Sequence, residues 1–184
     1  MKVNLEGIEN NIKTEILETL EEQFKIYPEI KKRLRFVGIT DKEAYNVKDA
    51  VCYVSSYGTD LIITDKINDS KEITSFIVSG SPRAYITHEC GHLLDKCLQC
   101  SGHNCPARTS NSKKYRKGTA SLYKKYIMEK SSAVSLYARQ SEEEFIAEVY
   151  TQMTLKGRDT NKYTEEFALL LDDITEEDFG KLMG

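Results

Sequence analysis

The residues best suited to chemistry in this chain lie in one short stretch, His88-Glu89-Cys90-Gly91-His92. Residues four apart lie on the same face of a helix, so two imidazoles at this spacing can bind one Zn²⁺ ion, as in the H-E-x-x-H pattern. Glu89, next to the first histidine, can then act as a general base toward a water molecule beside the ion. The alternative is a helix with two ordinary histidines, but two of the chain's three histidines fall in this one turn.

The flanking residues predict the helix that this motif requires. Ser81 is a typical N-cap residue, and Pro82 is favoured at the first helical position. Apolar residues that would form a buried face then recur at helical spacing. They are Tyr85, Ile86, Leu93 and Leu94. We therefore predict a helix from about Pro82 to Leu98.

A catalytic zinc ion normally has three protein ligands, and the motif supplies only two of them. Six residues beyond His92 stands Leu98, which cannot bind a metal. Asp95 lies one turn beyond His92 and is better placed to support that histidine than to share its metal. His103, in a polar segment, is a geometrically acceptable candidate, and Glu144 is a fourth, far along the chain.

Glu144 has two competing interpretations. Ser141 and Glu144 satisfy the S-x-x-E capping box, which explains both residues without any metal. Glu148, however, lies one turn later on the same face, where it could accept the N–H of a metal-binding histidine while Glu144 binds the metal. Without a cation these two carboxylates would repel each other mildly. The spacing alone leaves both interpretations open.

Together these motifs resemble the zinc-peptidase family that includes the catalytic domain of anthrax lethal factor and the secreted Pro-Pro endopeptidases. That family has an H-E-x-G-H helix, then a tyrosine, then an E-F-x-A-E helix, which here correspond to His88–His92, Tyr137 and Glu144–Glu148. The resemblance covers roughly residues 81–154. It implies a small zincin-like domain with one catalytic zinc ion and six residues in defined roles. The implied zinc ligands are His88, His92 and Glu144, the general base is Glu89, the oxyanion donor is Tyr137, and the partner of a ligand histidine is Glu148.

The chain departs from that family in three respects. Cys90 stands where a larger residue is usual, a polar cysteine-rich stretch separates His92 from Tyr137, and no export signal is visible. The anti-repressor peptidases of phages and mobile elements are a second similar family, because they also join H-E-x-x-H to a glutamate-bearing helix. Those peptidases are intracellular, which agrees with the lack of a visible export signal, but a resemblance to them does not explain the spacing between Tyr137 and the other motifs.

A cysteine-rich cluster follows the metal-binding motif. Its thiol and imidazole groups are suited to a tetrahedral structural zinc site, although the spacing is too compressed for a common zinc ribbon. A disulfide such as Cys100–Cys105 and a set of free thiols are the alternatives, and a redox role would require a lowered thiol pKa. The candidate residues are Cys97, Cys100, His103 and Cys105.

Composition and charge indicate a globular enzyme of modest size. The 184 residues have a net charge of -3, which gives no reason to expect binding to nucleic acid. The basic stretch Lys113–Lys117 is more typical of a solvated loop than of a binding patch. The charged N-terminal segment lacks the apolar stretch of a signal peptide, so we expect a cytoplasmic protein with reduced cysteines and no membrane association.

The hydrophobic pattern predicts a single α+β domain of residues 1–184. Residues 1–80 are expected to contain N-terminal helices from Ile8 to Leu34, broken at Pro28, and then short strands. The runs near Val51 and Leu61 look like a β-hairpin in a short mixed or antiparallel sheet, and Ile73–Val78 is ambiguous between strand and helix.

The metal-binding part, residues 81–184, is expected to be helical, in three further segments. A helix resumes near Ser121 after a polar loop, a second begins at Ser141, and a third runs from Thr164 to Met183.

These expectations point to a zinc-dependent endopeptidase that acts on a peptide or protein substrate. The alternatives are an intracellular anti-repressor-type peptidase and a catalytically weak regulatory or interaction module of a phage or mobile element. A cysteine-cluster zinc module that binds nucleic acid is disfavoured by the acidic balance of the chain.

Overall fold

A computed structural model describes residues 1–40, 50–69, 78–99 and 110–174. These residues form an α+β fold with six α-helices and one four-stranded sheet, which confirms the α+β part of the predicted fold class. No helix in these four ranges is long and apolar enough to cross a membrane. The helices are α1 (Asn10–Ile26), α2 (Pro28–Arg33), α3 (Pro82–Leu98), α4 (Ser110–Met128), α5 (Glu142–Lys156) and α6 (Lys162–Asp172). Two 3₁₀ turns are η2 (Asp65–Asp69) and η3 (Tyr137–Arg139).

The sheet is mixed, with the strand order β1-β2-β4-β3. The strands are β1 (Lys2–Asn4), β2 (Phe36–Gly38), β3 (Cys52–Val54) and β4 (Asp60–Ile63). β1, β2 and β4 run parallel, and β3 pairs antiparallel with β4 as the predicted hairpin. Strand β1 was not predicted, because its three residues have no apolar alternation and its pairing with β2 is set by tertiary structure. The hairpin places β3 at an edge of the sheet.

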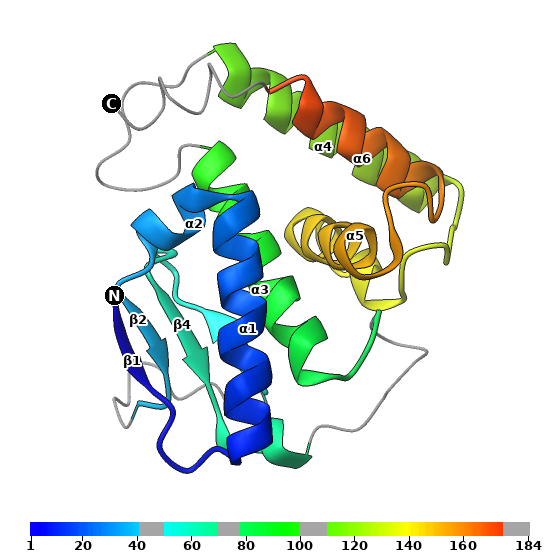
Figure 1. The fold of residues 1–184 in the computed structure, drawn as a ribbon. Helices are drawn as coiled ribbons and strands as arrows, with labels where there is room; N and C mark the ends of the chain where they lie inside the picture. The colour runs from blue at the N-terminus through cyan, green and yellow to red at the C-terminus, as the bar shows by residue number, and fades with distance from the viewer. Residues whose placement is uncertain (41–49, 70–77, 100–109, 175–184) are drawn as a thin grey trace.

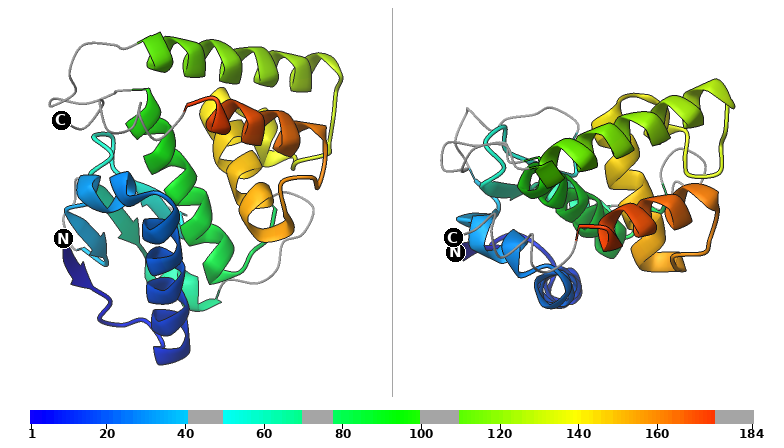
Figure 2. Two further views of the ribbon diagram at one scale, coloured as in Figure 1. Left: turned by 45° about the horizontal axis from the view of Figure 1, so that its top comes forward. Right: turned by 90° about the horizontal axis from the view of Figure 1, so that it is seen from above.

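Helix α3 occupies the middle of the molecule (Figure 1). It packs against α1 on one side and against α5 on the other, and its first half also contacts β3. The helices α4 and α6 lie side by side and cover α5, so α5 is enclosed between them and α3 (Figures 1 and 2). A helix in this position is surrounded by protein, so its polar side chains must find partners from neighbouring elements.

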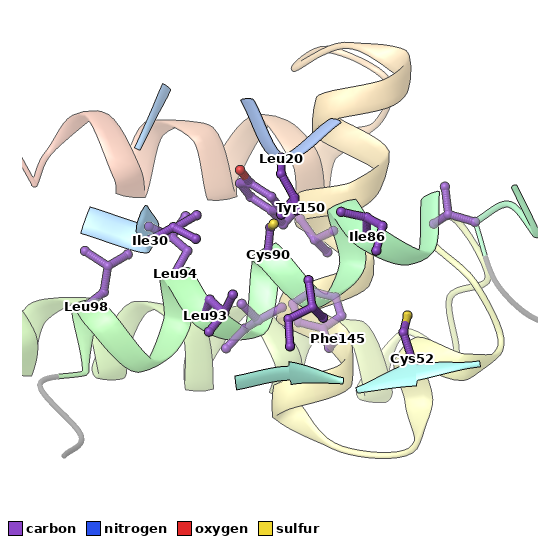
Figure 3. Close-up of a cluster of buried hydrophobic side chains, with 14 of the residues drawn as sticks. Leu20, Ile30, Cys52, Ile86, Cys90, Leu93, Leu94, Leu98, Phe145 and Tyr150 are labelled. Atoms are coloured by element: carbon purple, nitrogen blue, oxygen red, sulfur yellow. The ribbon is translucent and has the colours of Figure 1, made fainter. Parts of the chain in front are cut away.

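One cluster of buried apolar residues extends from Leu5 to Ile174, across both parts of the chain on either side of residue 80. Helix α3 supplies its centre, as Figure 3 shows, and side chains from α1, α2 and α5 surround it. The labelled members on these helices are Leu20, Ile30, Ile86, Cys90, Leu93, Leu94, Leu98, Phe145 and Tyr150. Cys90 is fully buried, so the small side chain at this place in the motif packs as part of the core.

Two predictions about the second half of the chain need correction. The polar stretch was expected to continue as a loop to Gly118, but α4 begins at Ser110, and the basic run Lys113–Lys117 is helical. Tyr115, inside that run, is fully buried, which anchors this turn of the helix despite its polar neighbours. The last predicted helix begins at Lys162, with Asn161 and Thr164 as a capping box. It was expected to continue to Met183, but it ends at Asp172, with Asp173 as its C-cap residue. Residues 175–184 and the segment Ile73–Val78, apart from Val78, lie outside the described residues.

The crossing of α3 and α5 is unusually close at Gly91. A Cβ atom added at Gly91 would lie 2.9 Å from Cα of Ala147 and 3.2 Å from Cδ1 of Tyr150. Backbone atoms of a packed helix cannot move aside easily, so any larger residue at position 91 would push the two helices apart. Glycine is therefore required here by the packing of the two helices, although it weakens a helix by itself.

We predict that Gly91→Ala lowers the free energy of unfolding by about 1–2 kcal/mol, because the overpacking cost exceeds the gain in helix propensity. Gly118→Ala in α4 is a matched control, because its new Cβ would meet the flexible end of Leu170, with Cδ1 at 2.7 Å. That leucine is half-buried and can rotate. Chemical denaturation should show Gly118→Ala at or above the stability of the wild type. Equal stability of all three proteins would contradict the close-crossing argument.

Candidate metal centre

Helix α3 begins at the predicted capping residues and carries the H-E-x-x-H motif, as the sequence indicated. Ser81 is the N-cap, and its Oγ accepts a hydrogen bond from the backbone N–H of Ala84 at 3.2 Å, while Pro82 is the first helical residue. His88 and Glu89 are buried, and the side chain of His92 is largely covered. The two imidazoles lie edge to face, with 4.8 Å between their ring centroids.

Helix α5 brings the third candidate ligand to these imidazoles. Ser141 is its N-cap, and Ser141 Oγ accepts a hydrogen bond from the backbone N–H of Glu144 at 3.1 Å. The carboxylate of Glu144 lies against His88 and His92. The two interpretations of this segment are thus compatible: the serine caps the helix, and the side chain of Glu144 is free to face the histidines.

Three ligand atoms converge at one point. His88 Nε2 lies 3.1 Å from His92 Nε2 and 3.1 Å from Glu144 Oε2, and His92 Nε2 lies 3.5 Å from the same oxygen. Ligand atoms about 2.0–2.1 Å from a tetrahedral zinc ion are about 3.3 Å apart, so the three observed separations fit such an ion. These residues could therefore hold a metal ion, and they are the only such group among the described residues.

Glu148 fixes the orientation of His88. Glu148 Oε1 lies 2.7 Å from His88 Nδ1, and Glu148 Oε2 accepts a hydrogen bond from the backbone N–H of Val78 at 2.9 Å. When the imidazole is neutral, its Nδ1–H donates to this carboxylate, so the lone pair of Nε2 points at Glu144. A lone pair facing a carboxylate needs a cation between them, and a metal ion or a proton on Nε2 can supply it. This is the arrangement expected for a metal ligand and its supporting carboxylate.

The contacts among these histidines and carboxylates also shift the pKa values of His88 and Glu144. Burial alone would lower the pKa of His88, but its contacts with Glu144 and Glu148 raise it to about 10 in the protein without metal. Burial alone would raise the pKa of Glu144, but hydrogen bonds with His88 and His92 hold it well below its usual range. At neutral pH the metal-free cluster therefore keeps a proton on His88, and a metal ion that binds there must displace that proton.

The base candidate Glu89 lies beside a residue that the sequence analysis did not single out. Cys52 Sγ, in the edge strand β3, lies 3.8 Å from Glu89 Oε1. Burial, together with the charge of Glu89, raises the pKa of the Cys52 thiol, so it stays protonated and can donate a weak hydrogen bond. The sequence shows Cys52 only as one member of a short β-strand, and nothing in that pattern indicates its contact with the motif.

Tyr137, in η3, also belongs to this site. Its ring centroid lies 5.8 Å from that of His88, with an angle of 46° between the rings. Burial raises the pKa of Tyr137, and the charges of Glu144 and Glu89 and a hydrogen bond with Glu144 add to the rise. The hydroxyl therefore remains protonated at neutral pH and can serve as a hydrogen-bond donor.

Asp95 is not brought to the three candidate ligands. Asp95 accepts hydrogen bonds from Gln99 Nε2 at 2.9 and 2.8 Å and from Tyr115 Oη at 3.0 Å, so it joins α3 to α4. Cys97, the first member of the cysteine-rich cluster, is half-buried. The other members of the cysteine-rich cluster, Cys100, His103 and Cys105, lie outside the described residues, and their role as a structural metal or redox site stays a prediction.

We predict that wild-type protein binds one zinc ion and that Glu144→Ala weakens this binding by at least about tenfold, because a charged ligand is lost. Glu143→Ala is the matched control, since it removes the same charge from an exposed neighbour. Isothermal titration calorimetry of the three proteins with Zn²⁺ tests this. Equal affinities for Glu144→Ala and wild type would remove Glu144 from the ligand set and leave Ser141 and Glu144 as helix-capping residues only.

Comparisons with known proteins do not bear on these assignments. No family model matches the chain, and searches of curated proteins and of solved structures find no match. The resemblance to the lethal-factor family thus rests on the motifs in the sequence, and the case for a metal centre rests on the geometry of His88, His92 and Glu144.

Proposed function

We propose that this protein is a zinc-dependent endopeptidase with a zincin-like active site. The observation that carries the proposal is the convergence of His88, His92 and Glu144, with the carboxylate of Glu89 on the same helix turn. A zinc ion held by these three residues would act as a Lewis acid on the scissile carbonyl and would increase the acidity of a water molecule. Two histidines and one glutamate are a known ligand set of catalytic zinc, with a fourth position left open.

Glu89 is the general base of this proposal. Its carboxylate would accept the proton of the attacking water and later transfer it to the nitrogen of the leaving amine. The side chain is buried, with Cys52 as a neighbouring donor, so the number of orientations open to the carboxylate is limited. A base restricted in this way loses little conformational entropy when the substrate reacts.

Tyr137 is suited to stabilise the negative charge that develops on the substrate oxygen. Its ring lies beside that of His88, and its protonated hydroxyl hydrogen-bonds with Glu144. When a substrate is bound, this hydroxyl would turn from Glu144 to the developing oxyanion and stabilise it as a hydrogen-bond donor.

The edge strand β3 is the proposed binding site for the substrate backbone. It pairs with β4 on one side only in the described sheet, and its first residue, Cys52, contacts Glu89. An extended peptide added to this edge would form main-chain hydrogen bonds and pass next to the metal-binding residues. The substrate is therefore proposed to be a peptide or a protein segment in extended conformation.

Replacing Glu89 by glutamine tests the proposed function. We expect Glu89→Gln to keep the fold and the bound zinc but to cleave peptides about 10²–10⁴ times more slowly, because an amide cannot accept the proton of water. Zinc-loaded wild type and variant would be incubated with a peptide library, and cleavage would be followed by mass spectrometry. Unchanged turnover in the variant would place the catalytic centre elsewhere.

A wild-type protein that binds zinc at His88, His92 and Glu144 but cleaves no peptide in the library would support the alternative. That alternative is a metal-binding regulatory module without turnover. Zinc content alone does not separate the two functions, because both require the same ligands.

Tyr137→Phe tests the oxyanion role. We expect kcat to fall about 10²–10³-fold with little change in KM, because a donor to the transition state is lost and ground-state binding is kept. Tyr123→Phe is the matched control, since Tyr123 is also partly exposed and its hydroxyl donates to the Arg139 carbonyl at 3.2 Å, outside the metal-binding cluster. Both variants should retain zinc and thermal stability. If Tyr137→Phe cleaves at the wild-type rate, Tyr137 has only a packing role.

A further inference from the structure

Helix α4 has a charge unlike that of the rest of the chain. Its 19 residues contain six basic side chains and no acidic one. The whole chain has a net charge of -3, so the remainder, without the six positive charges of α4, has a net charge of -9. The basic residues of α4 are Lys113, Lys114, Arg116, Lys117, Lys124 and Lys125.

Two of these six cations form ion pairs with acidic residues of the same chain. Lys114 forms an ion pair with Asp173 at 3.1 Å, and Lys125 pairs with Glu166 of α6. The other four, Lys113, Arg116, Lys117 and Lys124, are exposed, and within the described part of the chain none of them has an ion-pair partner. We refer to these four residues as the basic stripe.

The members of the basic stripe share one face of α4. Lys113, Lys117 and Lys124 are spaced i, i+4 and i+11, which is helical spacing, and Arg116 lies beside them. Along the helix axis the stripe extends for about 16 Å, at 1.5 Å per residue. Ala120 and Ser121, exposed between the cations, are small, so a partner can approach the helix backbone closely.

The opposite face holds α4 rigidly in place. Tyr115 and Tyr126 are fully buried, and their hydroxyls donate to Asp95 at 3.0 Å and to the Ser135 carbonyl at 2.6 Å. Thr119 Oγ1 donates to Glu142 Oε1 at 2.8 Å. The backbone of the stripe is thus already ordered before any partner binds, which lowers the entropy cost of binding.

We propose that the basic stripe is a docking surface for an acidic segment of a partner protein, independent of the peptidase activity proposed above. Charge complementarity identifies the partner: four exposed cations on one helix face, without ion-pair partners among the described residues, match a short run of Asp and Glu residues. A short segment fits because its charges can remain within the stripe and away from the acidic remainder of this protein.

Two other polyanions fit less well. A nucleic-acid duplex carries phosphates along its whole length, and beyond about 16 Å these would meet the acidic surface. In α4, Tyr115 and Tyr126 are buried and cannot stack on the bases of a single strand, and Tyr123 alone is partly exposed, whereas single-strand binding relies on the stacking of successive bases. Anionic membranes usually require apolar side chains that insert, whereas the residues between the cations are Ala120 and Ser121.

The test measures the direct binding of a fluorescent acidic peptide by fluorescence anisotropy. The peptide has about 12 residues of mixed Glu and Asp, a length that would span the basic stripe as a helix. We expect saturable binding that weakens with added salt. The variant Lys113→Glu/Lys117→Glu/Lys124→Glu should bind the peptide at least about tenfold more weakly. The control Lys2→Glu/Lys25→Glu/Lys32→Glu makes the same charge change at exposed lysines of other elements and should bind as wild type does.

Each possible result of these binding measurements either supports or overturns the proposal. Loss of binding in the stripe variant alone supports the proposal, and circular dichroism must show that this variant is folded. If it is not folded, Lys113→Gln/Lys117→Gln/Lys124→Gln replaces it in the same assay. Equal weakening in the control variant, or no binding by wild type, overturns the proposal. Tighter binding of a DNA duplex or of vesicles that contain phosphatidylserine also overturns it, because the partner would then belong to another class.

Discussion

The close crossing of α3 and α5 is the contact on which the candidate metal centre depends. Because Gly91 has no side chain, the backbone of Ala147 lies so close to it that a Cβ atom at position 91 would be 2.9 Å from Cα of Ala147. At this separation His88 and His92 on one helix meet Glu144 on the other. A wider crossing would leave the same residues present but too far apart to share one ion. The geometry of the site is thus a consequence of helix packing, with the glycine of the motif as its essential element.

The cluster at this crossing is costly for the stability of the protein. It places Glu89 and Glu148 in buried positions, where a charge loses most of its hydration. Glu148 recovers part of this cost through His88 and the backbone N–H of Val78. Well-packed apolar residues would often serve stability as well or better. Titratable groups whose pKa values are shifted by their neighbours, as those of His88 and Glu144 are, are instead typical of functional sites.

How much of this arrangement could be predicted depends on the range of the interactions. The start of α3 follows from Ser81 and Pro82, and the start of α5 from Ser141, because capping is a local effect visible in the sequence. The role of the Glu144 side chain could not be decided locally, since a capping box and a metal ligand use the same residue types. Strand β1 and the contact of Cys52 with Glu89 depend on tertiary pairing, which leaves no periodic signal. The early start of α4 depends on burial of the single residue Tyr115 among polar neighbours.

The edge strand β3 and its hairpin turn are anchored at two places, to α3 and to α2. At one end Cys52 contacts Glu89. At the other, Arg33 of α2 donates from Nε to the Gly58 carbonyl at 2.9 Å and from Nη2 to the Tyr57 carbonyl at 3.1 Å, which ties down the hairpin turn. Gly58 has a φ of 64°, a conformation that glycine adopts without strain. A substrate strand added at β3 would therefore find the edge already ordered.

The charges of the site also explain why a divalent cation suits it. Three carboxyl side chains, those of Glu89, Glu144 and Glu148, lie close to His88, and the histidines lower the pKa of Glu144, so this part of the cluster carries negative charge. In the metal-free protein one proton on His88 offsets part of this charge. A divalent ion at the same point offsets twice as much and is attracted by the lone pairs of both Nε2 atoms. A metal ion and a proton would thus compete for a single position, and the buried side chain of Glu148 would support the imidazole with either one.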